Sequence, residues 1–123
     1  MEITLKISEK QYKVMLEALD LYGRLMMGQT CIINEKMNYN GLFDSRNTPD
    51  TISKDIALRY FPDKNINGVN NHLGISNTCE NGKISMDIYA HLRYNSGLEK
   101  DHSVWKNTPI NHSKENIDIK IEK

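Results

Sequence analysis

Two arginines with aromatic neighbours are the residues of this sequence best suited to bind a ligand. Arg24 follows Tyr22, and Arg93 lies between Tyr89 and Tyr94. The planar guanidinium group can donate paired hydrogen bonds to phosphate and can stack on a flat ring. These residue types are therefore typical of a small nucleotide pocket. The alternative role of each arginine is an ion pair one helical turn away, or a contact with the end of its own helix.

The histidines and cysteines show no spacing that predicts a metal site or a nucleophile. Cys31 and Cys79 are far apart, and the histidines at positions 72, 91, 102 and 112 are spread along the second half of the chain. A zinc site would bring such ligands together at short spacing. The sequence also contains no glycine-rich phosphate loop and no nucleophile elbow. We therefore expect no metal, no cofactor and no catalytic residue.

The composition indicates one folded domain over residues 1–123. Sixteen basic and sixteen acidic residues leave no net charge, and 38 % of the residues are hydrophobic. Zero net charge argues against a protein that coats DNA, RNA or an anionic membrane. No apolar run approaches the roughly 18 residues that span a bilayer, and the first residues are too charged for a secretory signal. We expect a cytoplasmic protein with reduced cysteines.

The elements that would position these residues begin with a strand and a helix. Residues 3–7 alternate between apolar and polar side chains, which predicts a half-buried strand. Ser8 and Gln11 have the spacing of a capping box, and apolar residues then recur every three or four positions. This pattern predicts a helix that runs to about Met27 and is ended by Gly28.

Two further helices and two further strands are expected. The run Thr48-Pro49-Asp50 predicts the start of a helix that ends at about Tyr60. An apolar stripe at 84, 88 and 92 predicts another helix, which closes at 95–97. Residues 103–105 and 117–121 are expected to be strands, whereas 29–48 receive no assignment. Together the elements predict an α+β fold, an antiparallel sheet with two or three helices packed on one face and strands at both chain ends.

Three stretches of the chain resemble a family of small phage proteins. They are ALDLYGRLMMGQ at 18–29, LGISN at 73–77 and SMDIYAHLRY at 85–94. Their order and approximate spacing are similar to those of the phage anti-Thoeris sponges, the first described family of Thoeris anti-defence proteins. The resemblance covers the first 30 residues and roughly 70–95.

The resemblance implies an α+β protein that assembles into dimers or larger oligomers. Family members bind, without cleaving it, the 1″–3′ glycocyclic ADP-ribose signal made by Thoeris TIR enzymes, and so keep the host effector inactive. Some members also hold cyclic oligonucleotides of CBASS defence at a second site. The expected location is the cytoplasm of the infected bacterium. The expected partners are the cyclic signal and further copies of the chain, with no DNA, RNA or membrane.

The resemblance also implies a set of ligand-binding residues. Arg93 matches an arginine that we assign to the diphosphate, and Asn77 matches an asparagine suited to the base or ribose. Gly23, Met86 and Tyr94 depart from the family pattern. Because one chain offers few cations near Arg93, we expect a second protomer to complete the site. The implied ligand-binding residues are Arg24, Gln29, His72, Asn77, Tyr89 and Arg93. Among them, His72 takes the place of a second aromatic residue that the family pattern leads us to expect. Asp87 and Tyr22 also match the family, but their alternative role is packing.

Two other functions stay open from the sequence. The first is an enzyme that degrades a cyclic nucleotide, with His91 or His102 acting with Asp87 as acid and base. The second is an inhibitor that presses residues 29–48 or an edge strand onto a host protein. A DNA-binding accessory role is disfavoured by the zero net charge.

Overall fold

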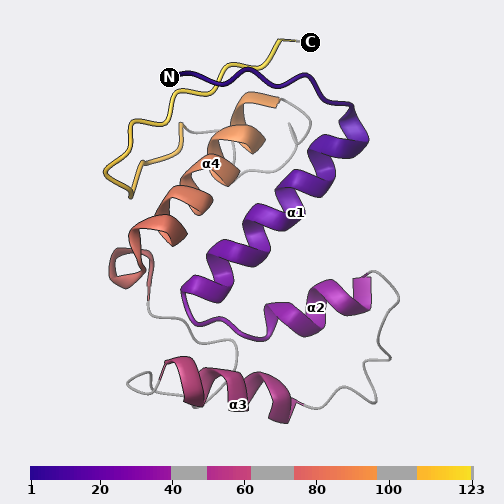
Figure 1. Ribbon diagram of the computed structural model, residues 1–123, viewed down its shortest axis with the longest axis vertical. Coiled ribbons are helices and arrows are strands. Elements are labelled where there is room, and N and C mark those ends of the chain that lie inside the picture. The colour runs from indigo at the N-terminus through magenta and orange to yellow at the C-terminus, as the bar shows by residue number, and fades with distance from the viewer. Residues whose placement is uncertain (40–49, 62–73, 97–107, 123) are drawn as a thin grey trace.

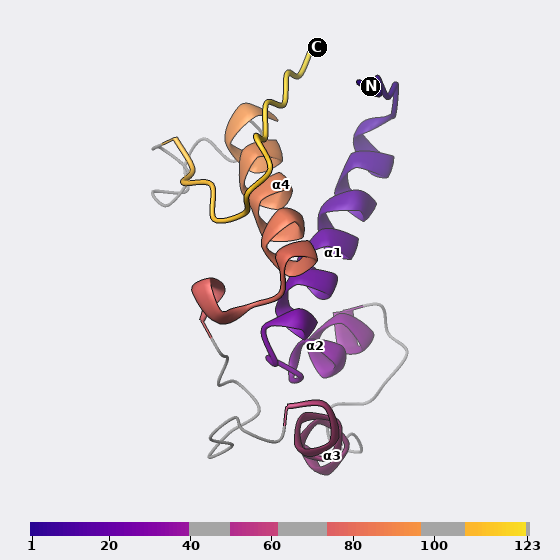
Figure 2. The same cartoon turned by 60° about the vertical axis from the view of Figure 1, so that its left-hand side comes forward.

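Four helices make up most of the described chain. The computed structural model describes residues 1–39, 50–61, 74–96 and 108–122 (Figure 1). Its elements are α1 (Glu9–Met26), α2 (Ile32–Tyr39), α3 (Asp50–Tyr60), the short 3-10 helix η1 (Ile75–Asn77) and α4 (Glu80–Ser96). Helices α1 and α4 pack side by side, and α2 follows the end of α1 (Figures 1 and 2). Among the helices of these ranges, none is long and apolar enough to cross a membrane.

The predicted α+β fold with an antiparallel sheet is wrong. Residues 3–7 and 117–121 have the expected alternation of side chains, but within the described ranges no residue belongs to a strand. A strand needs a backbone partner, and alternation alone does not supply one. The third expected strand, at 103–105, lies outside the described residues. The described part of the chain is therefore a helical assembly with an extended segment near each end.

The three predicted helices are confirmed as α1, α3 and α4. The capping box at the start of α1 is present: the Gln11 backbone N–H donates to Ser8 Oγ at 3.1 Å, and the Ser8 N–H donates to Gln11 Oε1 at 2.8 Å. These two bonds satisfy amide groups that have no partner within the helix. The sequence signal thus fixes the residue at which α1 begins.

A glycine in the left-handed region ends α1. Gly28 has a φ of 83°, a backbone conformation that residues other than glycine rarely adopt. Its N–H donates to the carbonyl of Leu25, and the N–H of Gln29 donates to the carbonyl of Arg24, both at 2.9 Å. This pair of bonds is a Schellman motif. It turns the chain sharply, so that α2 begins only a few residues later.

Helices α1 and α4 approach closely at two glycines. A Cβ atom on Gly23 would lie 2.2 Å from the Sδ atom of Met86. A Cβ atom on Gly82 would lie 2.8 Å from the Cβ atom of Met26. The absence of a side chain at both positions therefore allows the close approach. Met86 occupies the space that a side chain at position 23 would need.

Two hydrogen bonds fix the register of α1 against α4. The hydroxyl of Tyr12 donates to the carbonyl of Leu92 at 2.9 Å, and the hydroxyl of Ser85 donates to the carbonyl of Leu19 at 2.8 Å. Each joins a side chain of one helix to the backbone of the other. A shift of one helix along the other would break both bonds.

The turn after α1 holds α3 in place. The Thr30 hydroxyl donates to the carbonyl of Ser53 in α3 at 2.7 Å, and both residues are fully buried. Cys31, Ile32 and Ala57 are buried as well. Ala57 lies one helical turn after Ser53, so buried apolar residues stand close in sequence to both ends of this hydrogen bond.

The segment 108–122, here called the C-terminal strap, runs along α4 (Figure 1). Side chains of Glu80, Asp87, His91 and Asn95 bond to it. Their spacing of seven, four and four residues places them on one face of the helix. Because the residues that contact α1 lie on a different face, α4 lies between α1 and the strap.

Candidate ligand-binding site

Arg93 and Tyr89 form one preorganised unit on α4. Arg93 Nη1 donates to the Tyr89 hydroxyl oxygen at 2.6 Å, and the guanidinium carbon lies 5.1 Å from the centre of the Tyr89 ring. The two residues are four positions apart, which places them on the same helix face. The hydrogen bond and the cation–π contact hold the guanidinium group in a defined orientation. An oriented guanidinium suits the recognition of phosphate.

Tyr89 is electrostatically connected to α1. Burial raises the pKa of its phenol, and the carboxylate of Asp20 raises it further, while Arg93 and Arg24 act in the opposite direction. The pKa stays above its ordinary value, so the phenol is neutral at physiological pH. Tyr89, Arg24 and Arg93 therefore lie close enough to share one electrostatic environment.

Asp20 is the anionic centre of this environment. Its carboxylate is buried and accepts from Arg24 Nε at 2.8 Å and from Lys36 Nζ at 3.0 Å. Lys36 also pairs with Glu17. This network ties α2 to α1. This network and the Tyr89–Arg93 pair are together called the cluster, which comprises Glu17, Asp20, Arg24, Lys36, Tyr89 and Arg93.

The protonation of Lys36 follows from the same network. Burial lowers the pKa of the ammonium group, but the hydrogen bonds and charges of Glu17 and Asp20 outweigh that effect. The pKa is therefore raised above its usual value. Lys36 stays charged and contributes a permanent positive charge beside Asp20.

Arg24 makes the ion pair that the sequence offered as the alternative to a ligand contact. Its ion pair with Asp20 is the expected contact one turn away. The pair uses Nε, however, and 34 % of the Arg24 side chain is exposed to solvent. In the part of the chain that the structure describes, its Nη atoms make no further bond. Arg24 is therefore held through Nε, whereas its Nη atoms remain available to a ligand.

Gln29 and Asn77 lie near the end where α1 finishes and α4 begins. Gln29 is half-buried in the Schellman turn, and Asn77 is exposed in η1 just before α4 (Figure 1). Arg93 lies in the last turn of α4, 16 residues after Asn77. Asn77 precedes α4, and the 13 residue steps from Glu80 to Arg93 span about 20 Å of helix at 1.5 Å per residue. One compact nucleotide cannot span that distance within a single chain. His72 lies outside the described residues.

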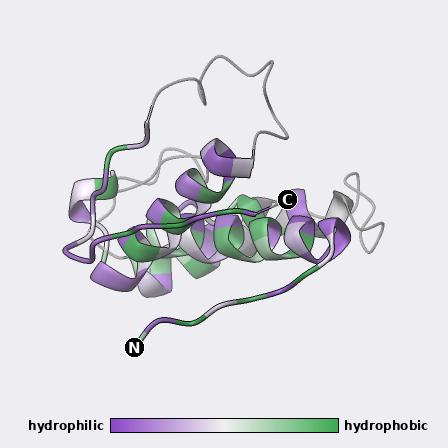
Figure 3. Ribbon diagram, turned by 90° about the horizontal axis from the view of Figure 1, so that it is seen from above, coloured by the Kyte–Doolittle hydropathy of each residue, from purple (hydrophilic) through white to green (hydrophobic). Residues whose placement is uncertain are grey.

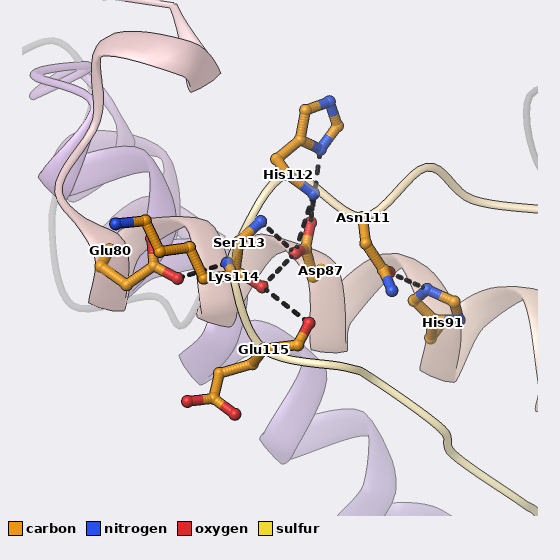
Figure 4. Close-up of polar contacts among 8 residues, drawn as sticks. All are labelled: Glu80, Asp87, His91, Asn111, His112, Ser113, Lys114 and Glu115. Carbon is orange, nitrogen blue, oxygen red and sulfur yellow. Dashed lines mark hydrogen bonds and ion pairs between the residues drawn. The ribbon is translucent and has the colours of Figure 1, made fainter.

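Asp87 has a different role from those in the cluster, because it binds the strap (Figure 4). Its side chain is only 1 % exposed. The carboxylate accepts from the backbone N–H groups of His112 at 3.0 Å and Ser113 at 2.8 Å, and from the Ser113 hydroxyl at 2.6 Å. Burial raises the pKa of Asp87, but the bonds from Ser113 and His112 outweigh burial and lower it below its ordinary value.

His91 also bonds to the strap and not to Asp87. Its Nε2 atom lies 2.5 Å from Asn111 Oδ1 (Figure 4). The backbone N–H of Lys114 donates to Glu80 Oε1 at 2.5 Å, and Asn95 Nδ2 donates to the carbonyl of Ile119 at 2.7 Å. The acid–base pair of Asp87 and His91 is therefore not assembled here. Sequence reasoning missed the partners of the strap, because they lie 20 or more positions from their contacts on α4.

Comparison with known proteins adds no assignment to this geometry. Within the described residues, no group of three or more histidine, cysteine or acidic side chains gathers as a metal site would require. No family model, no curated protein and no solved structure matches the chain.

Proposed function

We propose that this protein binds and sequesters a cyclic ADP-ribose signal, 1″–3′ glycocyclic ADP-ribose, without cleaving it. The observation that carries the proposal is the guanidinium of Arg93, oriented by Tyr89 and accompanied by the open tip of Arg24. The sequence resemblance to the anti-Thoeris sponges supports the same ligand. Sequestration would keep the Thoeris effector inactive in the cytoplasm of the infected bacterium.

The cluster has the chemistry that a diphosphate requires. A guanidinium group pairs with two phosphate oxygens at once, and charge-assisted bonds of this kind are about twice as strong as neutral ones. The neutral phenol of Tyr89 donates a hydrogen bond without adding negative charge. The guanidinium groups of Arg24 and Arg93 supply local positive charge for an anion, while the protein as a whole carries no net charge.

Self-association belongs to the proposal. Arg93 and Asn77 are too far apart in one chain to contact the same small ligand. Asn77 of one protomer could complete the site around Arg93 of another in a dimer or larger oligomer. Binding of cyclic oligonucleotides of CBASS at a second site is part of the same proposal.

A calorimetric titration tests the proposal directly. We expect glycocyclic ADP-ribose to bind tightly, whereas linear ADP-ribose binds weakly and a cyclic trinucleotide reports a second site. The bound ligand is then released by heat and weighed by mass spectrometry. Intact ligand supports sequestration, altered ligand supports the degrading enzyme, and absence of binding refutes both and directs the search to a host protein.

The variant Arg93→Ala locates the site. Loss of a charge-assisted phosphate contact of about 1.5–3 kcal/mol weakens binding by roughly tenfold or more. Arg59→Ala is the matched control, because Arg59 is exposed on α3 and away from the cluster. Equal affinity of the two variants would show that the site lies elsewhere.

A further inference from the structure

Residues 1–7 form an exposed segment in which every second side chain is apolar. Figure 3 shows this segment apart from the helices, with hydrophobic and hydrophilic residues in alternation. Ile3 is 75 % exposed, Leu5 64 % and Ile7 39 %. Among the residues that the structure describes, none bonds to the backbone of this segment. Apolar side chains that alternate on an unpaired backbone are the surface that a second strand covers.

The segment is complementary to a second copy of itself. When two copies run antiparallel with Thr4 opposite Thr4, Glu2 of each copy lies opposite Lys6 of the other. On the other face, Ile3 lies opposite Leu5. Opposite charges, threonine pairs and apolar pairs are the cross-strand pairs that stabilise antiparallel strands. A shift of one residue would bring apolar side chains opposite polar ones.

We propose that two copies of this chain associate through residues 1–7, which pair as an antiparallel two-stranded ladder about a two-fold axis at Thr4. The ladder forms between chains, so each chain on its own stays helical. Such an isologous contact uses the same surface on both copies. This ladder would be the interface of the self-association that the proposed function includes. The inference rests on the proposed function only in that it assumes self-association.

The ladder is too small for a permanent interface by itself. Stable interfaces bury about 1,000 Å² or more, and two short strands alone are marginally stable in water. We therefore expect a dimer that dissociates on dilution. The exposed Val14 on the following helix is available to extend the apolar contact.

Disulfide trapping tests the pairing and its register. Thr4→Cys is introduced together with Cys79→Ser, which removes the exposed native thiol. Two cysteines at position 4 would face each other across the axis, about 5 Å apart. In the control Lys6→Cys, on the same background, the two thiols would lie about 14 Å apart. We expect the variant at position 4 to form disulfide dimers at least tenfold faster under mild oxidation.

Charge reversal gives an independent result by analytical ultracentrifugation. Lys6→Glu places two pairs of like charges in the ladder, and we expect the dimer to weaken about tenfold. The double variant Glu2→Lys, Lys6→Glu restores both opposite-charge pairs and should restore the dimer. Circular dichroism checks that the helices of each variant remain.

Several outcomes would overturn the inference. They are a monomer at every concentration, trapping at position 6 as fast as at position 4, or failure of the double variant to restore the dimer. These measurements use no ligand. A dimer that does not bind glycocyclic ADP-ribose would refute the proposed function alone, whereas a ligand-binding monomer would refute the ladder alone.

Discussion

The bond between Asp87 and the C-terminal strap gives the strongest prediction of stability. Asp87→Asn keeps the shape of the side chain but replaces one acceptor oxygen by an NH₂ group. In the protein, two backbone N–H groups and the Ser113 hydroxyl donate to the carboxylate. An asparagine oxygen can accept only part of this set, and its NH₂ group faces donors.

The expected loss is large because the site is almost fully buried. Hydrogen bonds to charged groups contribute about 1.5–3 kcal/mol each, and an unsatisfied buried donor carries its own penalty. We expect Asp87→Asn to lower the free energy of unfolding by about 2–4 kcal/mol. Urea unfolding measures this loss. Hydrogen exchange should show the amides of His112 and Ser113 exchanging at least tenfold faster.

Asp118→Asn is the matched control. Asp118 is an exposed acid within the same strap, so its substitution should change stability by no more than about 0.5 kcal/mol. If Asp87→Asn were as stable as this control, or left exchange at 112 and 113 unchanged, Asp87 would not anchor the strap.

The pH dependence of stability follows from the lowered pKa of Asp87. A carboxyl group whose pKa is lower in the folded state stabilises the fold above its unfolded pKa, about 3.9. That stabilisation is lost as the pH falls through the folded pKa. The wild-type protein should therefore lose more stability than Asp87→Asn when the pH falls below about 4.

Three other substitutions probe the helices, each measured by urea unfolding. Gly82→Ala should cost about 1–3 kcal/mol because its Cβ meets the fixed Cβ of Met26. Gly23→Ala meets the Sδ and Cγ atoms of Met86, a side chain that can change rotamer, and it gains helix propensity, so it should be the more stable of the two. The reverse order would show that Met86 cannot move aside. Lys36→Met should lower the free energy of unfolding by about 1–3 kcal/mol, because it removes one partner of the buried Asp20. The difference from the wild-type protein should vanish as the pH rises above the raised pKa of Lys36. An unchanged stability would show that the ion pair does not stabilise the fold. Ser8→Ala should cost about 1 kcal/mol through loss of the cap, and no change would show that the cap is dispensable.

The helices could be predicted because their signals are local. The capping box at Ser8 and the glycine at 28 mark the two ends of α1 within a few residues. The strands could not be predicted in the same way. Alternation at 3–7 and 117–121 indicates an extended chain with one apolar side, but it does not name the partner that would complete a ladder. In the strap, side chains of α4 take that place.

In the candidate site too, the contacts within one helix could be predicted, whereas the contacts between distant residues could not. The pairs Tyr89–Arg93 and Asp20–Arg24 are four residues apart, so helical spacing alone brings them together. The link from Lys36 to Asp20 depends on the turn after α1, and the bonds from Asp87 to the strap close a loop of about 25 residues. Contacts at such separations depend on tertiary packing, which spacing does not encode.

The strap also sets an order in which the protein can fold. Glu80, Asp87, His91 and Asn95 line up only after α4 has become helical. Residues 111–114 follow α4 in the chain, and docking them adds the entropy cost of bringing separated parts of the chain together. A chain that ends at Ser96 contains all of α4, yet the polar face of this helix stays open to other molecules until the strap is present. Closure of that face is then the last step in the assembly of this helix, and a chain truncated before residue 111 would carry α4 without its cover.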